Sequence, residues 1–443
     1  MARILQVKPH FPYPPHQGTR RVSLSLLGDL ASAHEVLYLC QRETRAEAAL
    51  IPEVERLGAR VVAPLMPNKR SPLHRALYKL QNQALARIQR RPPICYYWSN
   101  QVLRGALERW SREFRPDLTI LESWETFPLR RSIRHGRAVL LAHDAAFQIR
   151  ERAAAAATDP AERRRRARRS QREKALEVAS WALYDAILTL TEADRHTIEQ
   201  ELALRCAAGT TATDQRAPTP ESPSDGTRAA AGPAPAVHLP PVRHLPMPVA
   251  EAFFEFSRPP QLGQRVGFLG TFRADFNRDA LEHLLRDLWP AIRARVPQAE
   301  LIVAGNGYEG PLREGVLQAG GRWLGFVDDL RAYYESIDLL LVPLRFGAGL
   351  RIRILEALAA AAPVVASPIA VASLGLTDGE QYREAETPAE VATAVAALLA
   401  DPAAAQAMGR RGRDWCRREH GPEVIRPRRL AVIDELLVGS ATA

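Results

Sequence analysis

The chain contains few cysteines and no apolar run that reads as a membrane span. It has four cysteines in 443 residues, at Cys40, Cys95, Cys206 and Cys416. They form no C-x-x-C pair, which excludes a disulfide framework or a zinc site built on such pairs and is typical of a reducing cytoplasm. The opening run MARILQV is too short for a signal peptide, and Pro363 and Pro368 interrupt the apolar stretch at residues 358–376. We therefore expect a soluble protein, or one that rests on a membrane surface.

Acidic residues are also fewer than basic ones, 50 against 60, so the net charge is +10. A basic balance indicates nucleic acid, an anionic membrane surface or anionic substrates as partners. The sequence has no zinc-ligand spacing, homeodomain-like helix or aromatic-basic stacking motif, so we expect no nucleic-acid partner. Part of the excess lies in RRRRARR, residues 163–169. We interpret this run as a solvated helix face, with contact to anionic lipid as the alternative.

The length exceeds what one compact core accommodates, which predicts two domains. Short apolar runs alternate with helical segments in both halves, a pattern typical of parallel, doubly wound α/β sheets. Strands are expected at residues 4–7, 35–39, 60–63, 118–121, 138–142, 186–190, 266–269, 301–304, 339–342 and 364–366. The main helices are expected at residues 20–33, 162–180, 279–296, 330–336, 352–361 and 388–399.

The composition changes between the two halves. Residues 1–206 form the expected N-terminal domain and residues 241–421 the C-terminal one. Between them, residues 207–240 are rich in Pro, Ala, Ser and Thr and nearly free of large apolar side chains. Such a segment cannot bury enough surface to offset its ordering entropy, so we expect it to be disordered.

The segment PLRFGAGLRIRILEALAAAAP, residues 343–363, carries the clearest chemistry. Gly347 and Gly349 let backbone N–H groups approach a ligand, and the helix that follows offers unpaired donors and partial positive charge to a phosphate. Arg353 and Glu356 are three residues apart and share a helix face. That face combines a cation for phosphate with a carboxylate for two ribose hydroxyls. The alternative is an ordinary strand, loop and helix with a solvated polar face.

This segment resembles the donor-site signature of glycosyltransferase family 4, the retaining GT-B enzymes. The matching residues are the run from Arg353 to Ala357, with Glu356 as its glutamate, and then Pro363-Val364-Val365. The likeness is best over residues 266–420. It implies a GT-B fold, in which two Rossmann-like domains face each other across a cleft. It also implies that the C-terminal segment, residues 422–443, forms a helix that crosses back to the first domain.

A second motif, GFLGTFRADFNRDA, begins at residue 267. Gly270 and Asn277 match the family's spacing, and Thr271 and Arg273 would reach a pyrophosphate, with a helix N-cap as the structural alternative. The resemblance departs at two positions, since relatives have Arg and Lys where this chain has Thr271 and Phe276. One of the family's two glutamates is replaced by alanine at position 348. Arg273 and Arg353 would then supply the missing charge, with Arg353 as the main phosphate cation.

The resemblance extends to other loops and strand ends. Glycines would turn under the nucleotide base, backbone near a phenylalanine would read the base, and a strand-end His-Asp pair would contact the donor sugar. Turn geometry and core packing are the alternatives for these glycines and that phenylalanine. The remaining expected substrate-binding residues are Gly18, Arg20, Asp144, Thr191, Gly305, Gly307, Phe326, Gly347, Gly349 and Leu350.

The resemblance implies a metal-independent retaining hexosyltransferase without a cofactor. It would move a sugar from a nucleoside-diphosphate donor to a sugar, lipid-linked or small-molecule acceptor, in cell-envelope polysaccharide, glycolipid or natural-product glycoside synthesis. The expected catalytic residues are His143 at the donor sugar, Arg353 at the leaving diphosphate and Glu356 at the ribose. We expect a cytoplasmic protein, either free or peripheral on the inner face of the plasma membrane. The alternatives are a sugar-nucleotide epimerase and a non-catalytic partner subunit of the same fold.

Overall fold

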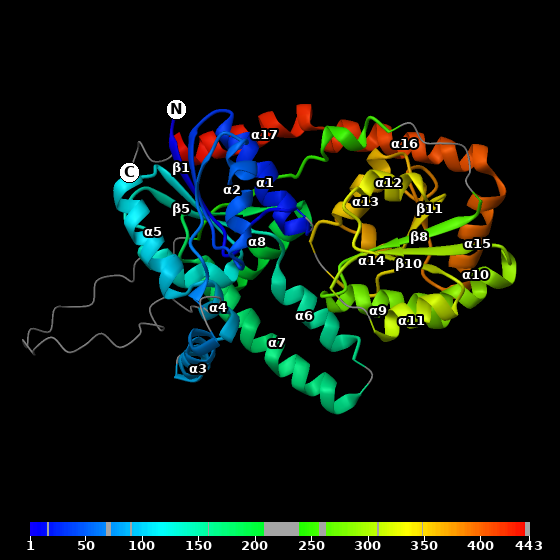
Figure 1. Ribbon diagram of the computed structural model, residues 1–443, viewed down its shortest axis with the longest axis horizontal. Helices are drawn as coiled ribbons and strands as arrows, with labels where there is room; N and C mark the ends of the chain where they lie inside the picture. Colours follow the sequence, from blue (N-terminus) through cyan, green and yellow to red (C-terminus); the bar gives the residue numbers. More distant parts are fainter. Residues whose placement is uncertain are drawn as a thin grey trace, which may run out of the picture.

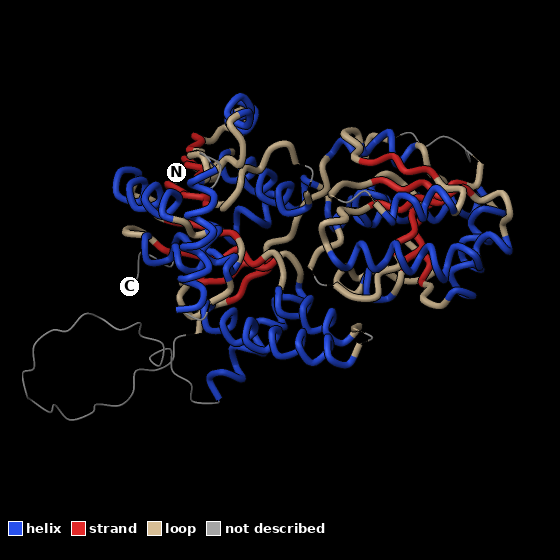
Figure 2. The backbone as a smooth tube through the Cα atoms, turned by 60° about the horizontal axis from the view of Figure 1, so that its bottom comes forward, coloured by secondary structure: helices blue, strands red, loops and turns tan. Residues whose placement is uncertain are grey.

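Two parallel sheets lie one beyond the other along the long axis of the computed structural model (Figure 1). The structure describes residues 1–15, 17–67, 72–88, 91–157, 159–207, 239–256, 263–307, 310–347 and 349–438. Nearly all of the segment expected to be disordered, residues 207–240, lies outside these ranges. Helices flank the strands of each sheet (Figure 2).

The first sheet has the strand order β3-β2-β1-β4-β5-β6-β7, and every pair is parallel. Its strands are β1 (Arg3–Val7), β2 (Glu35–Leu39), β3 (Arg60–Val62), β4 (Leu118–Glu122), β5 (Arg137–Ala142), β6 (Ala186–Thr189) and β7 (Val242–His244). All five residues of β4 are buried. Helices cover both faces of a parallel sheet, which is why its central strands read as continuous apolar runs.

The second sheet has the order β10-β9-β8-β11-β12-β13 and is also parallel. Its strands are β8 (Arg265–Leu269), β9 (Glu300–Ala304), β10 (Arg322–Gly325), β11 (Leu339–Val342), β12 (Val364–Ala366) and β13 (Arg383–Glu384). The expected fold class, two doubly wound α/β domains, is confirmed.

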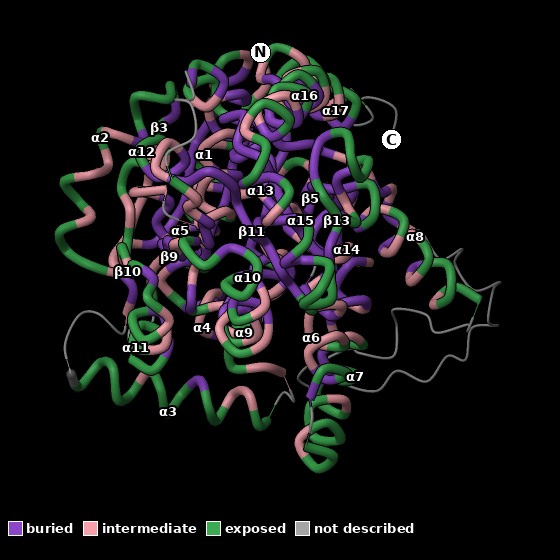
Figure 3. Tube along the Cα trace, turned by 90° about the vertical axis from the view of Figure 1, so that its right-hand side faces the viewer, coloured by how far each residue is buried: buried purple, intermediate pink, exposed green. Residues whose placement is uncertain are grey.

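Each half of the chain contributes helices as well as strands. The first half contains α1 (Gly18–Ala31), α2 (Ile51–Glu55), α3 (Pro72–Ile88), α4 (Pro93–Trp98), α5 (Gln101–Phe114), α6 (Ala146–Ala155), α7 (Pro160–Trp181) and α8 (Glu192–Ala207). The second contains α9 (Asp275–His283), α10 (Trp289–Arg295), α11 (Pro311–Gln318), α12 (Leu330–Glu335), α13 (Ile352–Ala359), α14 (Pro368–Val371), α15 (Pro388–Ala400), α16 (Pro402–His420) and α17 (Pro422–Val438). In Figure 3 the strands at the centre are buried, whereas α3 and the far end of α7 are largely exposed.

The ten expected strands are all present, and each end lies within one residue of the expectation. Three short strands, β7, β10 and β13, were not expected, because two to four residues are too few to show a period. The long helix expected at residues 279–296 is divided by a π-helical turn, Leu284–Leu288. The turn ends two residues before Pro290, whose nitrogen has no hydrogen to donate to the helix.

The expected start of the second domain at residue 241 requires a correction. β7 pairs with β6, so the first sheet extends to His244. Leu245 and Met247 are also buried in the core of the first domain. β7 has only three residues and follows the long low-complexity segment. The sequence pattern therefore did not indicate that it belongs to the first sheet.

Helix α17 runs back over the first domain (Figure 1). Ile433 and Leu436 pack in the core that contains α1, and Arg429 bonds Asp29 of α1. Among the described residues, no single helix has the length and apolar character needed to cross a bilayer. In the described ranges, one pair meets the criteria of length and composition together, α15 and the stretch from Pro402 to Val438, with a bend of 103° between them.

Candidate functional site

A cavity of about 470 Å³ lies between the two sheets and is lined by residues of both. It adjoins the carboxyl ends of β5, β8 and β9, where ligands bind in open parallel sheets. Of the expected site residues, the cavity is lined by Gly18, His143, Asp144, Gly270, Thr271, Arg273, Asn277, Gly305, Phe326, Gly349, Leu350, Arg353 and Glu356.

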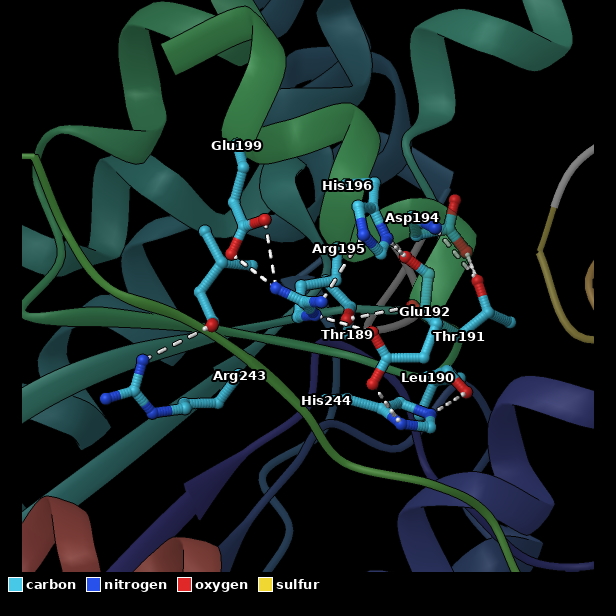
Figure 4. A network of polar contacts seen from close by, with 11 residues as sticks. Thr189, Leu190, Thr191, Glu192, Asp194, Arg195, His196, Glu199, Arg243 and His244 are labelled. Atoms are coloured by element: carbon cyan, nitrogen blue, oxygen red, sulfur yellow. Dashed lines mark hydrogen bonds and ion pairs between the residues drawn. The ribbon is translucent and has the colours of Figure 1, made fainter. Parts of the chain in front are cut away.

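Four expected residues do not line this cavity, and each has a structural role. The Arg20 guanidinium donates to the carbonyl of Pro14 at 3.3 Å. Thr191 turns toward Asp194 at the start of α8, with its Oγ1 atom 2.6 Å from Asp194 Oδ2 (Figure 4). A side chain at Gly307 would collide with Arg273, and one at Gly347 would collide with the Arg351 guanidinium. These two glycines therefore make room for arginines that do line the cavity.

Arg353 joins the two glycine motifs. Its guanidinium donates to the carbonyl of Leu269 and, at 2.7 Å, to Asn277 Oδ1. A Cβ atom at Gly270 would lie 3.0 Å from Arg353 Nη1, so the loop passes close to the cation. Burial lowers the pKa of Arg353 to about 10, which leaves it charged at neutral pH. Arg273, the other arginine expected at the phosphate, lines the same cavity.

Glu356 of α13 forms an ion pair with Arg21 of α1, across the boundary between the two domains. The carboxylate is 3% exposed. Burial raises the pKa of Glu356, and Arg21 and Arg353 oppose that shift. Arg20 was expected in the site, but a helix turns about 100° per residue, and the adjacent Arg21 is the arginine that lines the cavity.

Arg351 is a further cavity residue that was not selected. Its guanidinium lies over the Phe276 ring, 5.4 Å from the centroid. Burial and the neighbouring Arg353 lower the pKa of Arg351 to about 10. Phe276 is the position where the resemblance expects a lysine, so Arg351 brings a cation to that place from another element. Its position just before α13 was the available signal.

A buried polar network holds His143 at the end of β5. His143 Nε2 lies 3.0 Å from Glu122 Oε2, and Lys8 Nζ donates to the same oxygen at 2.9 Å. Glu122 also accepts from Gln6 at 2.8 Å and from Ser23. Burial alone would raise the pKa of Glu122, but Lys8 and His143 hold it well below its usual range. The signal in the sequence was a charged residue at the end of each of two apolar strands.

The second ring nitrogen of His143, Nδ1, is the one not bonded to Glu122, and the imidazole ring is neutral at neutral pH. Burial lowers the pKa of His143, although Glu122 opposes the shift. Within the part of the chain that the structure describes, Nδ1 has no hydrogen-bond partner. Such an atom is expected to find a partner in a ligand or a water.

Gly349 brings the loop before α13 against the first domain. Its φ of +77° favours glycine, and a Cβ atom there would lie 3.1 Å from Asp144 Cβ. Burial and the nearby Asp194 raise the pKa of Asp144 to about 6, while Arg150 and Arg351 oppose the shift. Asp144 therefore changes charge close to neutral pH.

The charged groups of the cavity are suited to an anion. Arg21, Arg273, Arg351 and Arg353 all line it. Over the described ranges, no group of three or more His, Cys, Asp or Glu side chains is placed to hold a metal ion.

Comparisons with known proteins find relatives over part of the chain. The chain is 38% identical over 149 residues to the phosphatidyl-myo-inositol mannosyltransferase of Mycobacterium leprae, covering 32% of this chain and 38% of that protein. The corresponding protein of Mycolicibacterium smegmatis is 37% identical over 144 residues, 32% of this chain and 36% of that protein. The matches thus span little more than a third of the length of these curated relatives.

Solved structures resemble the whole chain. The sucrose-phosphate synthase of Thermosynechococcus elongatus superposes with a TM-score of 0.65 at 16% identity, covering 99% of this chain and all of that one. Anabaena HepE, solved in complex with UDP and glucose, has a TM-score of 0.65 at 13% identity and covers 98% of this chain and 100% of its own. Identities this low show the fold alone.

Residues 263–401, which contain α13 and the Gly270 loop, match the family model described as Glycosyl transferases group 1. Over residues 263–401 the chain is therefore similar to the group 1 glycosyltransferases, family 4, and its two facing sheets have the GT-B fold.

Proposed function

We propose that this chain is a retaining glycosyltransferase that moves a hexosyl group from a nucleoside-diphosphate sugar to an acceptor hydroxyl. The observation that carries the proposal is the convergence of Arg351, Arg353 and Arg273 with Glu356 on one cavity between the sheets. Three cations suit a diphosphate, and a buried carboxylate suits the two hydroxyls of a ribose. The names of the relatives, which are mannosyltransferases, support a hexose as the transferred group.

The diphosphate would lie at the start of α13, against the Gly270 loop. Arg353 and Arg351 would stabilise the charge that grows on the leaving group in a cavity of low dielectric constant. The neutral His143 would orient a hydroxyl of the donor sugar through Nδ1. Attack would occur on the face that the diphosphate leaves, and a phosphate oxygen would take the acceptor proton, which retains the anomeric configuration.

Ribose binding at Glu356 would require Arg21 to move. Arg21 now occupies Glu356 Oε1, and its side chain is 25% exposed, so it can turn away without leaving a buried charge unpaired. Exchange of one charge-assisted partner for two hydroxyls would keep the carboxylate bonded.

The non-catalytic alternative rests on the replacement of the family's Arg and Lys by Thr271 and Phe276, and of its first glutamate by alanine at position 348. The stacking of Arg351 on Phe276 favours turnover instead, because it returns a cation to that position. We propose a lipid-linked acceptor at the cytoplasmic face of a membrane as the first candidate, since the relatives' names include phosphatidyl-myo-inositol. Sugar and small-molecule acceptors are the next candidates.

The test is an assay of the purified chain with a panel of UDP- and GDP-hexoses, with and without an acceptor mixture that includes phosphatidylinositol. Sugar transfer that depends on the acceptor supports the proposal. Conversion of the donor without acceptor would instead indicate an epimerase. Nucleoside-diphosphate binding with no turnover of any donor would indicate a partner subunit.

A further inference from the structure

Helix α3 has an apolar stripe that faces solvent. Its members are four large side chains on one helix face, with exposed fractions of 67% for Leu73, 57% for Leu77, 66% for Leu80 and 78% for Ile88. Their spacing of four, three and eight residues places all four within about a quarter of the helix circumference. Four exposed large apolar residues in a row are unusual for a surface that contacts only water.

The opposite face of α3 is the one that packs on the protein. Asn82 is 8% exposed, and the Tyr78 hydroxyl donates to the carbonyls of Tyr96 and Tyr97 at 3.3 and 2.9 Å. A surface helix of a globular protein normally buries its apolar face. Here a polar face is anchored by hydrogen bonds, and the apolar face is held outward.

The charged residues of α3 itself are all positive. The helix sequence PLHRALYKLQNQALARI contains no acidic residue, and its cations Arg75, Lys79 and Arg87 are exposed. Helix α7 projects from the same side of the molecule as α3 (Figures 1 and 3). Exposed arginines of α7, among them Arg164 and Arg168, line a hollow of about 650 Å³ that also includes Pro92, four residues beyond the end of α3.

We propose that α3 is a membrane-docking helix whose apolar stripe enters the interface of a bilayer rich in anionic phospholipid, while the arginines of α7 contact lipid phosphates. An amphipathic helix with cations beside its apolar face binds such interfaces through both buried apolar area and charge attraction. A second copy of the chain is the less favourable occupant, because it would bring together two acid-free basic helices. The inference goes beyond the proposed transfer reaction, since docking requires no turnover.

The experiment is co-sedimentation of the full chain with vesicles of phosphatidylcholine, or of phosphatidylcholine and phosphatidylglycerol in a 7:3 ratio. The wild-type chain should bind the anionic vesicles, and binding should fall as salt is added. Leu77→Glu with Leu80→Glu should lower the affinity at least tenfold. Arg164→Glu with Arg168→Glu should lower it for anionic vesicles by a similar factor. The matched control is Leu204→Glu. Leu204 belongs to α8, is 65% exposed and is not part of the proposed docking surface of α3 and α7.

Circular dichroism and thermal unfolding would verify that each variant is folded, and thermal shift with a nucleoside diphosphate would verify the cavity. Equal binding of the Leu77/Leu80 variant and the wild type would overturn the proposal, as would equal loss in the Leu204 control. A dimer of the wild-type chain that the Leu77/Leu80 variant abolishes, measured by light scattering without vesicles, would identify a second copy as the occupant. Failure of sugar transfer to a water-soluble acceptor with vesicle binding intact would count against the proposed function alone.

Discussion

Arg353 is the cation for which the sequence and the structure make the most specific prediction. Arg353→Ala should lower kcat about 100-fold and raise KM less, because the charge it meets grows in the transition state. Arg353→Lys should recover part of the loss, although lysine lacks the planar fork through which arginine donates from two nitrogens to Leu269 and Asn277. The measurement is steady-state kinetics with the identified donor, with unfolding curves to verify the fold.

Arg273→Ala is the matched comparison for this prediction, because Arg273 lines the same cavity but is exposed. We expect a smaller loss of kcat. Abolished turnover in Arg273→Ala beside a nearly silent Arg353→Ala would place the phosphate on the Gly270 loop instead.

Glu356→Gln should weaken the binding of a nucleoside diphosphate about tenfold or more without unfolding the protein. The amide keeps the shape but loses charge-assisted bonds, each of which contributes roughly 1.5–3 kcal/mol. Isothermal titration calorimetry measures the affinity directly. Arg21→Gln is the control, since Arg21 competes for the same carboxylate. It should leave the affinity equal or higher, and unchanged affinity in Glu356→Gln would remove Glu356 from the site.

The raised pKa of Asp144 predicts that the stability of the folded protein depends on pH. Burial and the nearby Asp194 raise the pKa of Asp144 to about 6 in the folded protein, above the usual range of an aspartate, so the folded state holds the proton more tightly. The stabilisation is present at low pH and is lost as the pH rises from about 4 through 6. Asp144→Asn removes this loss. The melting temperature of the variant, relative to that of the wild type, should therefore rise between about pH 4 and 6. Parallel curves from pH 4 to 8 would contradict the assignment.

At the scale of elements, α17 is fastened to α1 by a buried ion pair. Arg429 is 0% and Asp29 5% exposed, with 2.8 Å between Nη1 and Oδ2. Asp29→Ala leaves the guanidinium buried without its charge partner, so we expect a loss of about 3 kcal/mol in the free energy of unfolding. Adding Arg429→Met should restore most of it. Urea unfolding of the three proteins tests this, and a double variant no more stable than Asp29→Ala would refute it.

The elements themselves were largely predictable. A run such as Leu339–Val342 is apolar throughout because the strand is covered on both faces, so its position follows from local composition. β7 and the π-turn before Pro290 were not predictable in this way. The first depends on pairing with β6 across a long separation in the chain, and the second on how one proline is accommodated within a packed helix.

At the scale of the whole molecule, the two domains should fold without the low-complexity segment. Deleting residues 211–235, which lie outside the described residues, should change the free energy of unfolding by less than about 2 kcal/mol, since the segment has little apolar surface to bury. Chemical unfolding and donor turnover of the shortened chain provide the measurement. A larger loss would show that the segment packs against the folded domains.

Local sequence patterns and contacts between distant elements determine different features of this protein. The sequence by itself determined the parallel sheets, the glycine-opened helix and the shared face of Arg353 and Glu356, because periodicity and short spacing act within one element. The tertiary structure alone decided that Arg21 reaches Glu356, that Lys8 and Glu122 support His143, and that the apolar side of α3 faces outward. Those contacts join residues of different elements, and their geometry depends on how the elements pack, which no local pattern encodes.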